Sequence, residues 1–457
     1  MACQAEIKSG PLKGSVCGKP IKQSGVCGLH KTPYDRRVCK TGKYEQGVKT
    51  IGQSVVITDP NAGYWPTQIT AGQDVLKVFQ SGRHYCILAA QCQSGKTGVS
   101  KNAIANIQSV NPNILPIVII PISSNEILEQ TKREFHELVD LSNILSLPQL
   151  HDVDCLKRRM EKNPGRDFLI VIDESHLNSL VVPGEASCLF NALKSVDICT
   201  DGSFIPANCY ILSISATPTA ELAGLLQLRG AAEMPAESGK DIVYFKPGEN
   251  YYGLADMFST ERVFPAVPLK EEGDRQAFAE MIAARYATRQ KYGIVRLRSH
   301  VECLSLANHL ARHNIPALIY NSYNAATSDI STVLKRAPDQ LIMVLLVQRL
   351  RASIQLDTQH VCMVHENITA TVDTTVQGLP GRMCGYGKRA HAVDVYCNVE
   401  GLKAQLKWIN SGFAPEYIPH CRTVVGNYIP AKVSNLKAVY PEPVAKSIYY
   451  VNFNKIA

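Results

Sequence analysis

The sequence predicts an α/β protein with two parallel sheets, each made of buried strands that alternate with helices. Apolar runs of strand length recur along the chain, and segments with helical spacing of apolar residues separate them. Strands buried on both faces are apolar throughout, as these runs are. Residues 230–262 differ, because they are rich in Gly, Pro, Glu and Tyr, and they separate two series of such strands. Two α/β halves of similar size are the simplest arrangement.

The individual elements follow from these patterns in chain order. In the first half we expect strands at 83–90, 113–120, 167–172 and 209–214, with a helix at 125–138. A short strand is expected at 242–245. In the second half we expect helices at 272–291 and 301–313, and strands at 293–297, 317–320, 340–347 and 360–365. The predicted domains are a basic module (1–45), a first α/β half (46–235), a connector (236–271) and a second α/β half (272–457).

Composition and charge bound the class of protein. Of the 457 residues, 45% are hydrophobic and 19% are charged, which is ordinary globular composition. The polar N-terminus and the interrupted apolar runs predict neither a signal peptide nor a membrane span. Fifteen cysteines, mostly single and within apolar segments, favour a reducing, intracellular compartment such as cytoplasm or nucleus. Residues 1–50 contain ten Lys or Arg and three acidic residues, so most of the net charge of +8 lies there. This basic module indicates a polyanionic partner or, equally, a solubilising tail.

A phosphate-binding loop is predicted between the first strand and a helix. The segment Ala-Gln-Cys-Gln-Ser-Gly-Lys-Thr spans residues 90–97. Backbone N–H groups around Gln93, Ser94 and Gly95, with the positive end of the following helix, would bind phosphates. Lys96 would reach the β- and γ-phosphates, and the Thr97 hydroxyl would hold Mg²⁺. The loop departs from G-x-x-x-x-G-K-[ST], because its first glycine is replaced by Ala90.

Two acidic residues end a later apolar strand. Asp173 and Glu174 follow Leu169–Ile172, at the carboxyl edge where open α/β sheets bind ligands. We expect Asp173 to contact Mg²⁺ and Glu174 to orient or deprotonate the attacking water. A strand end with solvated acids is the alternative, and the upstream Lys96 argues against it.

The order of these segments resembles superfamily 2 helicases. Residues 90–97, the Asp-Glu-Ser-His of 173–176 and the Ser-Ala-Thr of 215–217 are similar to their motifs I, II and III, and 121–130 is similar to motif Ia. The segment 64–68 resembles the motif whose glutamine reads adenine, which makes Gln68 a candidate base contact. The resemblance, over roughly residues 60–400, implies two RecA-like lobes that hydrolyse ATP with Mg²⁺ while bound to DNA or RNA.

The second half carries a segment similar to motif VI of the same proteins. Residues 374–387 resemble Q-x-x-G-R-x-x-R, which implies that Gln377 contacts the nucleotide and that Arg382 stabilises charge on the γ-phosphate. One extra residue lies before Gly381, and Gly385 stands at the second arginine position, so Arg389 or Arg351 could also serve. Residues 350–357 resemble motif V without its glycine. The segments 381–386 and 247–253 are further similar to the Z1 family of helicase-like proteins.

The basic module also offers metal ligands. Cys3, Cys17, Cys27 and His30 form a CCCH set for Zn²⁺, with Cys39 as a substitute ligand. A module with few large apolar residues needs a metal to fold. The set is similar to short zinc modules on proteins of large DNA viruses and some phages, which implies a viral source and a location in a host cell or virion. The alternative is a disordered basic tail.

These features predict a nucleic-acid-dependent ATP hydrolase that moves along or remodels DNA or RNA. No membrane partner is expected, and a monomer is compatible with the sequence. Two other hypotheses remain open. One is a packaging-type motor with a nuclease in its second half, and the other is a degenerate helicase fold that acts as a nucleic-acid-binding scaffold.

Overall fold

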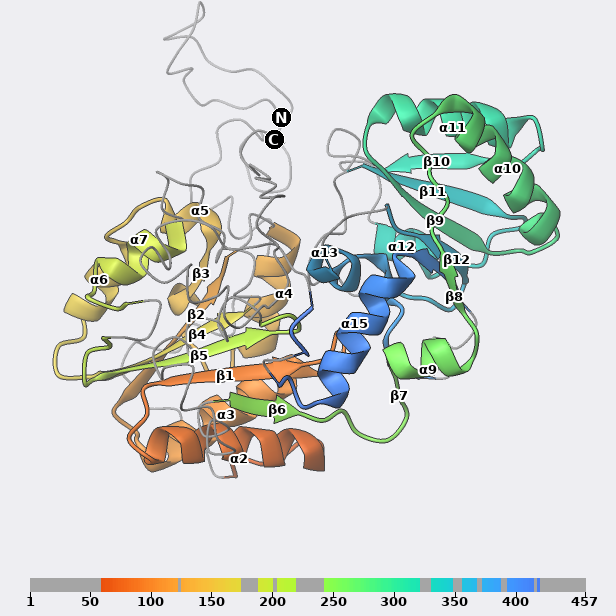
Figure 1. The fold of residues 1–457 in the computed structure, drawn as a ribbon. Helices are drawn as coiled ribbons and strands as arrows, with labels where there is room; N and C mark the ends of the chain where they lie inside the picture. The colour runs from red at the N-terminus through yellow and green to blue at the C-terminus, as the bar shows by residue number, and fades with distance from the viewer. Residues whose placement is uncertain are drawn as a thin grey trace, which may run out of the picture. The chain divides into compact units, whose positions relative to one another are not determined.

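The structure is a computed structural model. It describes residues 59–121, 125–173, 188–199, 204–218, 242–320, 330–347, 356–367, 372–387, 393–414 and 417–419. The described residues form two parallel sheets, and helices cover their faces (Figure 1). The α/β prediction is therefore confirmed for the described residues.

The first sheet has the strand order β3-β2-β4-β5-β1-β6, and all of its neighbours pair in parallel. Its strands are β1 (Tyr85–Ala90), β2 (Ile114–Ile120), β3 (Ile144–Ser146), β4 (Asp167–Asp173), β5 (Cys209–Ser215) and β6 (Ile242–Phe245). β6 comes from within the predicted connector, 236–271, and extends this sheet by pairing with β1.

Helices cover both faces of the first sheet, which explains why its strands lack alternation. They are α2 (Pro66–Gln80), α3 (Lys96–Val110), α4 (Asn125–Phe135), α5 (Leu147–Leu150), α6 (Cys155–Glu161) and α7 (Cys188–Lys194), with a short 3₁₀ helix at Leu141–Asn143. Along β4, Leu169 and Val171 pack with α2 and α3, whereas Phe168 and Ile170 pack with α5, α6 and α7. Each face is thus a separate apolar core.

The second sheet has the order β10-β11-β9-β12-β14-β8, again with parallel neighbours throughout. Its strands are β8 (Val263–Pro265), β9 (Tyr292–Leu297), β10 (Ala317–Tyr320), β11 (Ile342–Val347), β12 (Val361–His365) and β14 (Asp394–Cys397). Its helices are α9 (Leu254–Ser259), α10 (Glu272–Tyr286), α11 (His300–Ala311), α12 (Ile330–Leu334), α13 (Val372–Gln377), α14 (Leu379–Arg382) and α15 (Val399–Asn410). A separate antiparallel pair joins β7 (Tyr251–Tyr252) to β13 (Gly385–Tyr386).

Helix α10 is shorter than predicted. It ends at Tyr286 rather than at residue 291, and a turn follows in which Arg289 N donates to the carbonyl oxygen of Tyr286. Strand β9 begins at Tyr292, so the intervening residues have to reverse the chain direction. Residues 287–291 therefore form the turn between α10 and β9.

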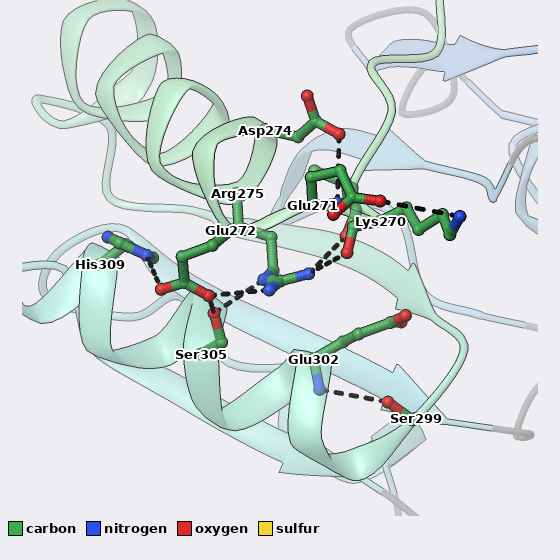
Figure 2. A network of polar contacts seen from close by, with 10 residues as sticks. Lys270, Glu271, Glu272, Asp274, Arg275, Ser299, Glu302, Ser305 and His309 are labelled. Carbon is green, nitrogen blue, oxygen red and sulfur yellow. Dashed lines mark hydrogen bonds and ion pairs between the residues drawn. The ribbon is translucent and has the colours of Figure 1, made fainter.

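A polar network fastens α10 to α11 on one face of the second sheet (Figure 2). The Glu272 carboxylate accepts hydrogen bonds from Arg275, Ser305 and His309 at 2.6–2.7 Å. Arg275 also donates to Ser305 and to the carbonyl oxygens of Leu269 and Lys270. These mutual bonds satisfy a buried arginine without any external ligand.

One apolar core joins the two halves. It contains Ile87 and Ala89 of β1 together with Val376 of α13, Leu379 of α14 and Trp408 of α15. Because these side chains are buried together, the carboxyl end of β1 lies next to the helices that carry Gln377 and Arg382.

Candidate active site

A cavity of about 690 Å³ contains most of the residues that the sequence singled out. From the first half it is lined by Gln93, Ser94, Gly95, Lys96, Thr97 and Asp173. From the second half it is lined by Gln377 and Arg382. A volume of this size suits a nucleotide-sized ligand. The tertiary structure thus brings together residues that lie almost 290 positions apart in the chain.

The sheet explains why the phosphate loop and Asp173 meet. β5 lies between β1 and β4, and all three strands run parallel, so their carboxyl ends share one edge. In the register, Asp173 pairs with Ile214, and Ser215 pairs with Ala89. The end of β4, the start of the 215–217 segment and the loop after β1 are therefore neighbours at that edge.

The loop at residues 91–97 has a backbone suited to anion binding. Gln93 and Gly95 have φ values of 55° and 94°, so the chain passes twice through the left-handed region. The buried Ser94 hydroxyl donates to the carbonyl oxygen of Gln91 at 2.7 Å. Helix α3 starts at Lys96 and runs for 15 residues, which directs the positive end of its dipole towards the loop.

Hard oxygen donors also line this cavity. Thr97 and Asp173 both line the cavity, and a hydroxyl and a carboxylate are donors that fit Mg²⁺. The predicted water-activating residue, Glu174, lies outside the described residues, as do the alternative arginines Arg351 and Arg389. Their roles remain predictions.

Gln68 lies beside the loop, but it does not belong to the cavity lining. Its amide nitrogen donates to the carbonyl oxygen of Gly95 at 3.1 Å, and its amide oxygen accepts from Trp65 N at 3.1 Å. A Cβ atom on Gly95 would lie 2.9 Å from that amide nitrogen, and the positive φ of Gly95 favours glycine at this position. In this arrangement Gln68 supports the loop. The adenine contact expected from the sequence stays a prediction.

The 215–217 segment contacts the second half directly. The buried side-chain amide of Gln377 donates to the Thr217 hydroxyl at 3.0 Å. One residue earlier, Gln405 of α15 donates to the carbonyl oxygen of Ala216 at 3.4 Å. The Ser215 hydroxyl accepts from Thr217 N at 3.0 Å, which shapes the turn after β5. A movement of this turn would therefore change its hydrogen bonds to α13 and α15.

Arg382 ends the short helix α14, and only 5% of its surface is exposed. Its Nη1 atom donates to the carbonyl oxygens of Gln377 and Gly378. The guanidinium group is thus held by main chain while the side chain lines the cavity. Gly381, immediately before it, has no room for a side chain, because a Cβ atom there would overlap the carbonyl oxygen of Val376 and lie 2.9 Å from Cys92 Sγ.

Several aromatic residues at the site were not predicted as site residues. Trp65 and Tyr386 line the cavity, with ring centroids 4.5 Å apart, and Tyr251 lies 5.5 Å from Tyr386. The two tyrosines belong to the segments 247–253 and 381–386, which the structure joins as the antiparallel pair β7–β13. The resemblance of both segments to one family was the only sequence signal for this contact. Lys335, which also lines the cavity, carried no sequence signal.

The predicted zinc ligands Cys3, Cys17, Cys27 and His30, and the substitute Cys39, lie outside the described residues. Within the described part of the chain, no group of three or more His, Cys, Asp or Glu residues could hold a metal ion. None of the helices in that part combines the length and apolar character needed to cross a bilayer.

Comparison with known proteins finds no matching family model. An uncharacterized protein of Acanthamoeba polyphaga mimivirus is 26% identical over 363 residues, which cover 73% of this chain and 85% of the viral protein.

Solved structures similar to this chain include those of two helicase-type proteins and an NTPase. The DUF1998 helicase MrfA bound to DNA and AMPPNP has a TM-score of 0.45 at 15% identity, covering 82% of this chain and 54% of its own. The chain thus spans about half the length of MrfA. The E. coli DExH-box NTPase HrpB has a TM-score of 0.45 at 13% identity (78% and 43% covered). A S. cerevisiae Dbp5 variant bound to RNA and ADP BeF3 has a TM-score of 0.43 at 14% identity (83% and 97% covered). The activity of this chain has to be inferred from its own cavity.

Proposed function

We propose that this chain hydrolyses ATP in the cavity at the edge of the first sheet, and that hydrolysis drives movement along, or remodelling of, DNA or RNA. One observation carries the proposal. A single cavity is lined by a phosphate-type loop with its lysine, by a strand-end carboxylate and by an arginine from the second half. Positioning and charge stabilisation are what phosphoryl transfer requires of a protein.

The first half would bind the triphosphate. Backbone N–H groups of Gln93, Ser94 and Gly95 would contact the phosphates, and Lys96 would neutralise the β- and γ-phosphates. Thr97 and Asp173 would hold Mg²⁺, which would neutralise negative charge on the phosphates. Glu174 would orient the attacking water.

The second half would complete the site. Arg382 would stabilise negative charge that develops at the γ-phosphate, and its own bonds to main-chain carbonyls would reduce the entropy cost of holding it there. A change in the nucleotide that moves Gln377 would also move Thr217, since the two side chains share a hydrogen bond. The contact supports coupling between ATP hydrolysis and nucleic-acid binding.

Lys96→Ala gives the largest effect, because the variant loses the cation that contacts two phosphates. We expect phosphate release by the wild-type protein to rise when single- or double-stranded nucleic acid is added. In the variant, both the basal and the stimulated rates should fall to background. The measurement is phosphate release at saturating MgATP, with Lys101→Ala, on the same helix, as the control for fold and purity. Full activity in Lys96→Ala would overturn the site assignment.

A scaffold without catalysis is the second candidate. Ala90 and Gly385 stand where the resembling proteins have glycine and arginine, and these departures favour it. Nucleic-acid binding without nucleotide hydrolysis, in the same assay, would support the scaffold. Metal-dependent nuclease activity of the purified chain would instead favour a packaging-type motor.

For residues 1–45 we propose a zinc module that adds salt-sensitive affinity for the nucleic-acid backbone. The mimivirus relative is compatible with a viral source and with a location in the host cell or virion. Protein purified without chelator should contain one Zn²⁺ per chain, and Cys27→Ser should lose it. Zinc content that is absent from the wild type, or equal in the variant, would contradict this assignment.

A further inference from the structure

Two tyrosine hydroxyls from beyond the first sheet reach the phosphate loop. Tyr251 Oη donates to the carbonyl oxygen of Cys92 at 2.5 Å, and Tyr386 Oη donates to that of Ser94 at 3.2 Å. The two residues are direct partners in the β7–β13 pair. Tyr386 Oη also accepts a hydrogen bond from Gly248 N at 3.0 Å, which fixes the direction of its own donation. We call Tyr251 and Tyr386 the tyrosine pair.

Bonds to carbonyl oxygens set where the loop's N–H groups point. In a trans peptide, the C=O of one residue and the N–H of the next are directed oppositely, and the described chain contains no cis peptide. Anchoring the Cys92 carbonyl therefore directs the N–H of Gln93 away from the Tyr251 hydroxyl. Anchoring the Ser94 carbonyl does the same for the N–H of Gly95. These are the groups that would meet phosphate oxygens.

Two further loop carbonyls are anchored from within the first half. Ser94 Oγ donates to the carbonyl oxygen of Gln91, and Gln68 Nε2 donates to that of Gly95. Only the tyrosine pair, among these anchors, comes from residues 251–386. The loop thus has contacts with the antiparallel β7–β13 pair, whose second strand follows Arg382 by a few residues.

The tyrosine pair is protonated at neutral pH, as is any tyrosine with a pKa of about 10 or above. Burial raises the pKa of Tyr251 well above its ordinary value, and it also raises the pKa of Tyr386. Both hydroxyls therefore remain protonated at neutral pH and can donate. Neighbouring Tyr252 differs, because its hydroxyl contacts the Thr260 hydroxyl at 3.0 Å.

We propose that Tyr251 and Tyr386 are positioning residues that hold the phosphate loop in its nucleotide-binding shape from the second half of the chain. This inference rests on the proposed ATP site. It adds that the affinity for the nucleotide depends on two hydroxyl groups outside the phosphate loop. Nucleotide binding and the β7–β13 pair then stabilise each other, since each favours the same loop conformation.

The test compares Tyr→Phe changes that remove one hydroxyl each. In the full-length protein, Tyr251→Phe and Tyr386→Phe should each raise the Kd for MgADP about threefold to tenfold, the effect of one hydrogen bond. KM for MgATP should rise in parallel, while kcat at saturation stays within about threefold, because the reacting groups are retained. Tyr252→Phe is the matched control, and its Kd should equal that of the wild type. Calorimetric titration and steady-state phosphate release give these values.

The fluorescence of Trp65 gives a second measurement of nucleotide binding, which distinguishes weaker binding from a general loss of stability. The chain has two tryptophans, of which Trp65 is 47% exposed and Trp408 is buried. The Tyr386→Phe change keeps an aromatic ring beside Trp65, so acrylamide quenching of Trp65 fluorescence without nucleotide should match that of the wild type. Protection of Trp65 by MgADP should then require more nucleotide in Tyr386→Phe, in proportion to its Kd.

The possible outcomes distinguish failure of the positioning role from failure of the proposed ATP site. If the wild type binds MgADP and Lys96→Ala does not, but both tyrosine variants bind as tightly as Tyr252→Phe, the positioning role is wrong and the ATP site stands. A uniform rise in Kd that includes Tyr252→Phe also overturns the role, since it would reflect stability alone. If the wild type binds no nucleotide, the proposed function and this inference both fail.

Discussion

Arg382 and Arg275 are two buried arginines of the second half with similar bonding and different surroundings. Their exposed fractions are 5% and 8%, and each uses Nη1 to donate to two consecutive main-chain carbonyl oxygens. Arg275 also donates hydrogen bonds to Glu272 and Ser305 (Figure 2), whereas Arg382 lines the cavity that Lys96 also lines. A buried, hydrogen-bonded arginine is therefore not by itself a sign of function. The shared cavity distinguishes the two.

The largest expected difference is between Arg382→Ala and Arg275→Ala. Loss of an arginine that stabilises γ-phosphate charge costs about a thousandfold or more in kcat, so Arg382→Ala should nearly abolish turnover. Arg275→Ala should keep kcat within about threefold, because it lies in a structural network, and should lower the free energy of unfolding by about 1–3 kcal/mol. Phosphate release and urea unfolding measure the two effects. The distinction fails if both variants lose turnover equally.

An intermediate effect is expected at the contact between Thr217 and Gln377. Thr217→Val leaves the buried Gln377 amide without its acceptor, at a cost of about 1–3 kcal/mol in unfolding free energy. Gln377→Leu removes the other partner, and the double variant should be less destabilised than the sum, with a coupling of about 0.5–3 kcal/mol. Urea unfolding of the four proteins of the cycle measures it.

A control cycle pairs Thr217→Val with Gln276→Leu, whose amide bonds only within the exposed face of α10. These two changes should add within about 0.5 kcal/mol. A coupling in the control as large as that of Thr217 with Gln377 would show that the cycle reports something other than their hydrogen bond.

The smallest effect concerns the pH dependence of the α10–α11 network. Hydrogen bonds from Arg275, Ser305 and His309 lower the pKa of Glu272 from 4.5 to about 2. Because its pKa in the folded state is depressed, the ionised form stabilises the fold above pH 4.5, and this stabilisation is lost as the pH falls towards about 2. Glu272→Gln should show a shallower loss of Tm across that window. Exposure of the carboxylate keeps the difference small. Parallel Tm curves would contradict it.

Local patterns predicted nine of the described strands, but not β3, β7, β8, β13 and β14, and they placed residues 90–97 between a strand and a helix. The runs at 113–120, 167–172 and 209–214 are each within a residue or two of β2, β4 and β5, because a strand buried on both faces needs an uninterrupted apolar run. Helix ends were less predictable, as at Tyr286, because the turn is imposed by where β9 has to begin. Trp65, Lys335 and the tyrosine pair escaped prediction, since their sequence contexts differ little from those of ordinary packing residues.

The sequence by itself determined the α/β class and the cluster of Gly95, Lys96 and Thr97 between a strand and a helix, because burial period and turn chemistry are local properties. Only the tertiary structure decided which distant groups meet that loop. Tyr251 contacts Cys92 across 159 positions, and Gln377 contacts Thr217 across 160. Such contacts depend on the strand order of two sheets and on one shared core. Local sequence patterns predict neither the strand order nor the shared core, since pairing over that distance is set by the packing of whole elements.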